Sequence, residues 1–379
     1  MTRVMRALTS VLSCLSAFAC ESSPPGGAAA RARVSADSSE VAIRRLWDEY
    51  LRSKHGQFAA NAGTPSILWS ASEQLQWPMY DLAGFYLPDG AVPEVMRVAS
   101  AAPVSDSEYE IVTRFWDSGG STKRAVLTMT VFARQERGRW VLANALPRRT
   151  GAWGTEKVGS IQFRVAPRLK YDLVKARHAA VFVDSLARAF SVPAPPRLEY
   201  YVAESVDQAL EILGLEFPVR YGAAGGFAKP VNGQVFSGIP AHGENYRHEL
   251  SHVVLYSVLR GAETSLLASE GVATWLGGTA GGDFRSAVQR LESVMRAQPD
   301  LTLDAIIDGA EVPQEIRYAA GGVLAQMLNE AGGAPSLREF LRAGSRPAAI
   351  RTALERLMER PWSTIVADWR ARVARLAAT

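Results

Sequence analysis

Residues 245–255 read Asn-Tyr-Arg-His-Glu-Leu-Ser-His-Val-Val-Leu, and this stretch decides the fold of the second half of the chain. The residues around its charged positions favour a helix. Residues four apart share a helix face, so His248 and His252 can direct their imidazoles at one metal ion. Glu249, turned by about 100° around the axis, can reach a water on that ion without binding the ion. The pattern therefore predicts a zinc site with a neighbouring general base.

A third zinc ligand is available at Glu270, within the sequence Ala-Ser-Glu-Gly-Val-Ala-Thr-Trp-Leu of residues 268–276. We expect the first helix to run to Arg260, to break at Gly261 and to return as a second, antiparallel helix. Glu270 would then face the two histidines. Two alternatives stay open: Glu270 can stabilise a helix dipole from the first turn, and the histidines can be a surface pair.

The motif and the residues after it carry a family resemblance. His-Glu-x-x-His followed eighteen positions later by Glu-Gly resembles the gluzincin peptidases, and the match is closer to bacterial peptidase MA-like proteins. Those proteins are similar in having a Tyr-led helix next, here beginning at Tyr318, and then a closing helix with Trp, here Trp369. The resemblance covers about residues 155–376 and is specific between 245 and 330.

The resemblance implies an enzyme, a metallopeptidase with Zn²⁺ as its cofactor. The implied metal ligands are His248, His252 and Glu270, and the implied catalytic residues are Glu249 as general base and Tyr318 as a hydrogen-bond donor to the oxyanion. A buried core tyrosine is the alternative for Tyr318.

Two differences from other gluzincin peptidases bear on the kind of peptidase that is expected and on its ligand surroundings. The substrate-anchoring segment Gly-Ala-Met-Glu-Asn of aminopeptidase N relatives is absent, and Gly-Gly-Phe-Ala stands at residues 225–228. An endopeptidase, or a peptidase of unknown substrate, is therefore expected rather than an aminopeptidase.

Thr274 occupies the place of a thermolysin-like Asp, and His242 is expected to be a solvated loop residue. The Gly-rich stretch 221–244 is a candidate for the edge strand along which an extended peptide would lie.

The first residues predict an export signal. Arg3 and Arg6 precede an apolar run that ends in small residues, which is typical of a signal peptide over residues 1–19. Small residues before Cys20 also resemble a bacterial lipobox, so a lipoprotein anchored at Cys20 and a soluble periplasmic or secreted protein are both open. We expect the bacterial cell envelope as the location, with a membrane contacted only through a lipidated Cys20.

Composition excludes several kinds of chemistry. Cys14 and Cys20 are the only cysteines among 379 residues, which excludes cysteine nucleophiles, zinc ribbons and structural disulfides beyond the signal. Lys plus Arg number 42 against 38 Asp plus Glu, and the basic residues are scattered along the chain. The sequence therefore predicts no nucleic-acid partner. It does not predict an oligomeric state.

The fold class expected is α+β. We expect a flexible tether at 20–38, a small cone-like domain at 39–150 that resembles nuclear-transport-factor-2-like (NTF2-like) folds, and a peptidase MA-like domain at 155–376, mixed α/β at first and then mainly helical. The first of these domains has an apolar helix pattern from Val41 to Leu51 and then strand patterns. The strands expected are Tyr109–Trp116, Arg124–Arg134, Arg139–Ala145, Gly159–Val165 and Arg197–Ala203. The further helices expected are Lys175–Phe190, Val206–Leu213 and most of the chain from Asn245. Dense aromatic residues at 67–87 can fill a core or line a pocket.

The sequence thus predicts a secreted or lipid-anchored zinc peptidase that acts on peptides or proteins. The alternatives are an envelope-anchored binding module with a structural or vestigial zinc, and a zinc enzyme that hydrolyses a non-peptide bond.

Overall fold

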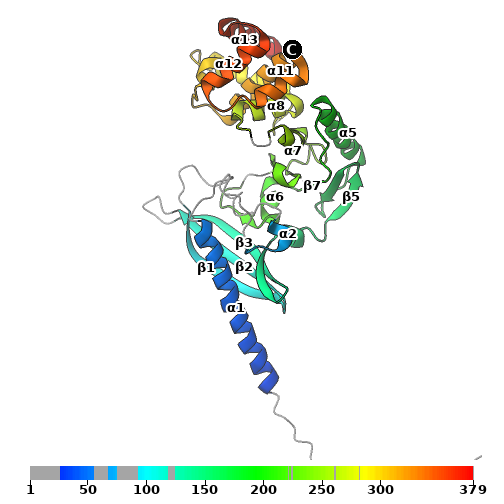
Figure 1. The fold of residues 1–379 in the computed structure, drawn as a ribbon, viewed down its shortest axis with the longest axis vertical. Coiled ribbons are helices and arrows are strands. Elements are labelled where there is room, and N and C mark those ends of the chain that lie inside the picture. Colours follow the sequence, from blue (N-terminus) through cyan, green and yellow to red (C-terminus); the bar gives the residue numbers. More distant parts are fainter. Residues whose placement is uncertain are drawn as a thin grey trace, which may run out of the picture.

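A computed structural model gives the fold of residues 26–54, 67–74, 93–117, 124–220, 222, 225–259, 262–280 and 282–378. Within these ranges the chain has a mixed α+β fold, as predicted, with two five-stranded sheets. Figure 1 shows the first sheet at one end, the second in the middle and helices α8 to α13 at the other end. The predicted signal peptide, Cys20 and the aromatic residues at 75–87 lie outside the described residues.

The first sheet is an antiparallel meander in the order β1-β2-β3-β4. Its strands are β1 (Pro93–Ser105), β2 (Glu108–Asp117), β3 (Arg124–Glu136) and β4 (Arg139–Asn144). The predicted hairpin joins β3 to β4 through Arg137 and Gly138, which both take positive φ, as a two-residue turn requires. Strand β1 was not predicted, because its alanines, serines and prolines give no apolar alternation.

Helix α1 (Gly26–Lys54) packs on this sheet through its C-terminal half. The side chains of Ile43, Trp47 and Tyr50 are fully buried, and the indole of Trp47 donates a 2.7 Å hydrogen bond to Oγ1 of Thr113 on β2. Trp69 is also fully buried and contacts Tyr50 edge to face, which favours core packing for this aromatic residue.

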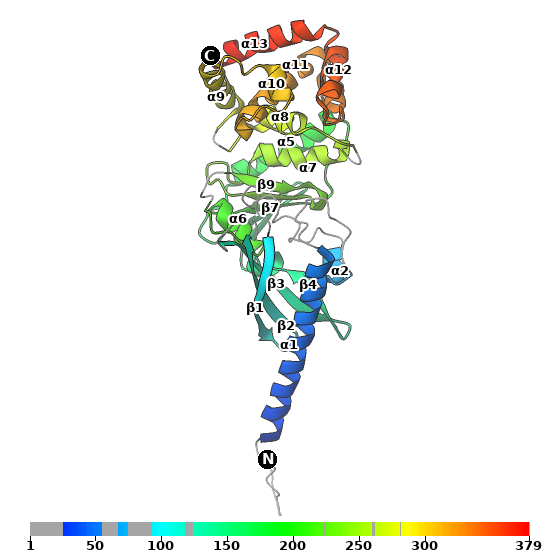
Figure 2. The ribbon, with the colours of Figure 1, turned by 90° about the vertical axis from the view of Figure 1, so that its left-hand side faces the viewer.

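Part of the predicted tether is helical, since α1 begins at Gly26 and projects beyond the sheet (Figure 2). Five alanines and two arginines between residues 28 and 36 explain the difference, because both residue types have high helix propensity. Polar, small-residue composition indicates weak packing, and it does not by itself indicate an unstructured backbone.

The second sheet has the order β5-β6-β7-β10-β9 and mixes parallel and antiparallel pairs. Its strands are β5 (Gly154–Val158), β6 (Ile161–Val165), β7 (Leu198–Val202), β9 (Gly226–Lys229) and β10 (Gln234–Ser237). Helices α5 (Leu173–Ala189) and α6 (Val206–Ile212) agree with the predicted helices in this region. Strand β9 lies at the edge of the sheet, within the stretch 221–244 where an edge strand was predicted.

The two sheets share core residues. After α6 the chain returns to the first sheet, where β8 (Leu215–Glu216) pairs with Thr128 and Met129 of β3. Tyr201 of β7 and Phe236 of β10 stack at 4.8 Å and belong to the same apolar cluster as the interior of the first sheet. The predicted boundary near 150 falls between α4 (Leu146–Arg149) and β5, and packing continues across it.

Helices form the rest of the chain, as predicted. They are α7 (Arg247–Leu259), α8 (Leu266–Gly277), α9 (Phe284–Ala297), α10 (Leu303–Ile307), α11 (Gln314–Leu341), α12 (Pro347–Met358) and α13 (Trp362–Ala378). Helices α8 and α11 cross closely, because a Cβ on Gly271 would lie 2.4 Å from the carbonyl carbon of Gly321. Gly333 interrupts α11 with a positive φ of 63°. In the described residues, no helix is long and apolar enough to cross a membrane.

Candidate metal centre

Helices α7 and α8 form the predicted antiparallel pair. Helix α7 lies between the second sheet and the C-terminal helices (Figure 2). The end of α8 touches the start of α7, since a Cβ on Gly277 would lie 2.2 Å from the backbone nitrogen of His248. Ser265 caps the start of α8 by accepting a hydrogen bond from the backbone N–H of Ala268. In this arrangement Glu270 lies on the face of α8 that packs toward α7.

The three predicted metal ligands come together between these helices. Nε2 of His248 lies 3.1 Å from Oε2 of Glu270, and Nε2 of His252 lies 3.4 Å from Oε1 of the same carboxylate. One ligand atom from each residue lies within 4.8 Å of the other two. In the described part of the chain this is the only such group of three or more side chains. Two imidazoles and one glutamate are the ligand set of catalytic zinc sites that keep an open position.

A backbone contact fixes the orientation of His248. Its Nδ1 lies 2.8 Å from the carbonyl oxygen of Gly278, directly after α8. Because a carbonyl oxygen only accepts hydrogen bonds, Nδ1 carries the hydrogen, and a neutral ring then presents its lone pair at Nε2, toward Glu270. In metal-binding histidines, the hydrogen bond made by the ring nitrogen that does not bind the metal sets the tautomer. The residues present therefore fit a zinc ion.

The electrostatics of the cluster favour a positive charge at its centre. Burial opposes a charge on His252, yet the carboxylates of Glu270 and, to a smaller extent, Glu249 together outweigh burial and raise the pKa of His252 to about 9. Burial likewise opposes a charge on Glu270, and His252 and His248 together hold its pKa well below the usual range. A proton on the histidine thus supplies the positive charge that a metal cation would supply.

Glu249 lies beside the ligands and is buried, with 6 % of its surface exposed. Burial raises the pKa of its carboxyl group, while the neighbouring histidines lower it. The backbone N–H of Ala228, on the edge strand β9, donates a hydrogen bond to it. Glu249 is therefore near the ligands and near the strand without being one of the three clustered ligands.

A cleft of about 850 Å³ opens over these residues. It is lined by the three clustered residues, by Glu249 and by Tyr318 near the start of α11, and strand β9 forms part of its wall. The ring centroid of Tyr318 lies 6.3 Å from that of His248. Burial, and then the carboxylates of Glu270 and Glu249, raise the pKa of Tyr318. Its hydroxyl is therefore a hydrogen-bond donor at neutral pH.

The two other residues singled out near the motif are not ligands in the cluster. His242 is half-buried rather than solvated, and its ring stacks on Tyr246 at 4.8 Å. Burial lowers the pKa of His242. Thr274 is fully buried, and its hydroxyl makes no hydrogen bond to any described residue, so it packs rather than orients a ligand.

Several residues of the cleft wall were not predicted from the sequence: Tyr246, Thr279, Arg290, Gln314 and Glu315. Tyr246 lies two residues before the motif, directly before α7, and this position could have predicted that it lies near the site. The others lie on a connector and on α9 and α11, so only the packing of those helices brings them to the cleft.

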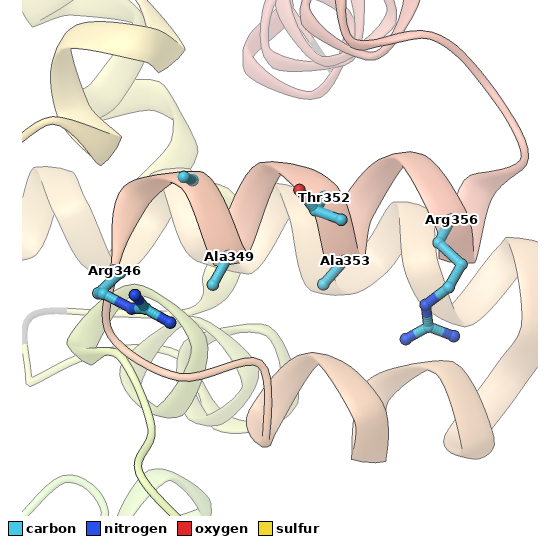
Figure 3. Close-up of a pocket in the computed structure, with 6 residues that line it drawn as sticks. Arg346, Ala349, Thr352, Ala353 and Arg356 are labelled. Carbon is cyan, nitrogen blue, oxygen red and sulfur yellow. The ribbon is translucent and has the colours of Figure 1, made fainter.

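A second hollow, of about 410 Å³, lies along α12 (Figure 3). Arg346 and Arg356 stand at its two ends, with Ala349, Thr352 and Ala353 between them. Arg356 is already paired with Glu339 at 2.6 Å. The hollow has no metal-ligating side chain or general base, so the cleft above α7 is the candidate site.

No protein-family model matches the chain, and no curated protein matches it. The gluzincin and NTF2-like resemblances therefore rest on the motif and the pattern of elements alone.

Proposed function

We propose that this chain is a zinc-dependent peptidase of the gluzincin type. The observation that carries the proposal is the convergence of His248, His252 and Glu270 beside Glu249, in a cleft walled by the edge strand β9. A purely structural zinc site would not need a buried carboxylate next to the ligands or an open cleft above them. Zinc bound there would lower the pKa of a water toward neutrality and polarise the substrate carbonyl.

The protein's own groups divide the remaining work. Glu249 accepts a proton from the attacking water and passes it to the leaving amine. The hydroxyl of Tyr318 donates a hydrogen bond to the oxygen that becomes negatively charged. Gly278, through its carbonyl, keeps His248 in the tautomer that presents Nε2.

The edge strand supplies a means of holding an extended peptide. Ala228 pairs with Val235 of β10, yet its N–H points away from β10 toward Glu249. Alternate residues of an edge strand direct their backbone groups outward, so the backbone of Gly226 and the carbonyl oxygen of Ala228 can pair with a peptide in the cleft, while the N–H of Ala228 serves Glu249. A peptide paired with β9 would have its backbone beside the zinc ligands.

Export belongs to the proposal as well. We infer a bacterial envelope protein, lipidated at Cys20 or released after residue 19, with peptides or proteins as its substrates and no nucleic acid.

The test compares zinc content and turnover on a mixed peptide library for the wild type and Glu249→Gln. We expect both to hold one zinc, and kcat to fall at least about 100-fold in the variant, the low end of general acid–base contributions. Glu263→Gln, an exposed acid outside the cleft, is the matched control and should leave kcat unchanged. Undiminished cleavage by Glu249→Gln would contradict the mechanism. Zinc without turnover in the wild type would favour the binding module, and hydrolysis of esters or amides other than peptides would favour the non-peptide alternative.

A further inference from the structure

Among the residues that the structure describes, Arg290 on α9 is the only arginine or lysine that lines the cleft with the zinc ligands. Its Nη2 donates a 3.0 Å hydrogen bond to Oγ1 of Thr279, another residue of the cleft wall. Thr279 is held in a tight turn by two backbone hydrogen bonds with Gly282. The same connector contains Gly278, whose carbonyl orients His248. Arg290 is therefore anchored to the segment that positions a metal ligand.

Arg290 forms no ion pair with a described residue, and Asp283, the exposed residue directly before α9, interacts with its charge only at longer range. No carboxylate oxygen of a described residue lies within 4.0 Å of its guanidinium group, and Glu315 on the same wall forms no ion pair with it. The positions three and four residues away on its own helix offer no carboxylate, because they are Ser, Ala, Ser and Val. Arg296 on the same helix differs, since it pairs with Glu292 at 3.0 Å.

A guanidinium group has five N–H donors in a planar fork that matches a carboxylate. One donor of Arg290 is used by Thr279. The residue is half-buried, so a carboxylate that reached it would be less screened than at an exposed arginine. The cleft volume of about 850 Å³ leaves room for a few peptide residues between the zinc ligands and this wall.

We propose that Arg290 binds a carboxylate of the substrate, so that the cleft selects peptides with a negative charge near the scissile bond. This inference rests on the proposed peptidase function and adds a substrate class to it. Two sources offer the same chemistry: the C-terminal carboxylate of the peptide, and an Asp or Glu side chain. Arg290 is a specificity residue in this account and takes no part in bond cleavage.

The test uses three forms of one neutral peptide that the wild type cleaves: the free C-terminal acid, the C-terminal amide, and amides with a single Asp at each position around the scissile bond. We expect at least one carboxylate form to exceed the neutral amide about 10- to 150-fold in kcat/KM, the range for one charge-assisted hydrogen bond. Arg290→Gln should remove this preference, so that the ratio of kcat/KM between the carboxylate forms and the neutral amide falls to about one. Arg296→Gln, on the same helix but outside the cleft, should keep the preference.

A binding measurement separates this inference from the peptidase proposal. Calorimetry on zinc-loaded Glu249→Gln, with and without Arg290→Gln, reports the affinities for the acid and amide forms without cleavage. Equal affinities for all forms, or a preference that survives Arg290→Gln, would overturn the role of Arg290 even if the wild type cleaves peptides. Preferential binding that depends on Arg290, together with no turnover by the wild type, would support the inference and reject the peptidase proposal.

Discussion

Zinc binding should displace a proton from His252. In the metal-free chain the carboxylates of Glu270 and, to a smaller extent, Glu249 outweigh burial and raise the pKa of His252 to about 9, so the imidazole is protonated at neutral pH. Zinc binds only the neutral ring. Below pH 9 the ion must therefore replace the proton, and zinc affinity should rise about tenfold for each unit of pH toward that value.

The size of the effect follows from the same geometry. The ordinary pKa of histidine is about 6.5, and the difference from about 9 corresponds to about 3 kcal/mol in favour of the charged ring. At pH 7 about 99 % of His252 is then protonated. In Glu270→Gln the carboxylate is gone and burial opposes the charge, so at most about a quarter of the rings should be protonated at pH 7.

Two measurements check this prediction. Calorimetric zinc titrations of the wild type at pH 7, in buffers with different ionisation enthalpies, should report about one proton released from His252 for each zinc bound. Nuclear magnetic resonance of the metal-free chain should give a His252 midpoint near 9 in the wild type and below 6.5 in Glu270→Gln. A wild-type midpoint near 6.5, or zinc binding without proton release, would refute the reasoning.

Three further predictions concern stability. In the metal-free chain, stability from the raised pKa of His252 is fully present below pH 6.5 and is lost as pH rises through about 9, so chemical denaturation should show a fall of up to about 3 kcal/mol over this window. Gly271→Ala should cost about 1–3 kcal/mol, because its methyl group would meet the α11 backbone. Gly332→Ala is the control for this variant, because the added methyl group would mainly meet the hydroxyl of Ser336, which can rotate away. A similar loss of stability in both variants would contradict the close crossing of α8 and α11. Trp47→Phe should lower the midpoint of urea unfolding by an amount equivalent to about 1–2 kcal/mol, because Thr113 loses its buried partner, and an unchanged midpoint would contradict this.

Local patterns in the sequence predicted much of the fold. Helix α5, helix α7 with its motif in an apolar run, and the hairpin at Arg137 and Gly138 depend on neighbours within a few positions. Strand β1 and the return of β8 to β3 depend on long-range pairing, which no local pattern encodes. The start of α1 was wrong in the sequence analysis because helix propensity exceeded the effect of polar composition.

The same distinction between local patterns and long-range packing applies to the candidate site. A spacing of four residues on one helix was enough to place His248 and His252 together, and the motif supplied Glu270. The contribution of Gly278 depends on where α8 ends, and that of Arg290 depends on how α9 packs, so neither had a signal in the sequence. The roles of Glu249 and Tyr318 in catalysis remain predictions.

The zinc content of the purified chain tests the central claim most directly. Wild type, His252→Ala and Glu270→Ala would be chelated, returned to zinc, dialysed and analysed by elemental mass spectrometry, with circular dichroism to establish that each is folded. The account predicts one zinc per wild-type chain and weakened or absent zinc in both variants. A folded wild type that holds no zinc, or variants that retain it fully, would contradict the three-residue site.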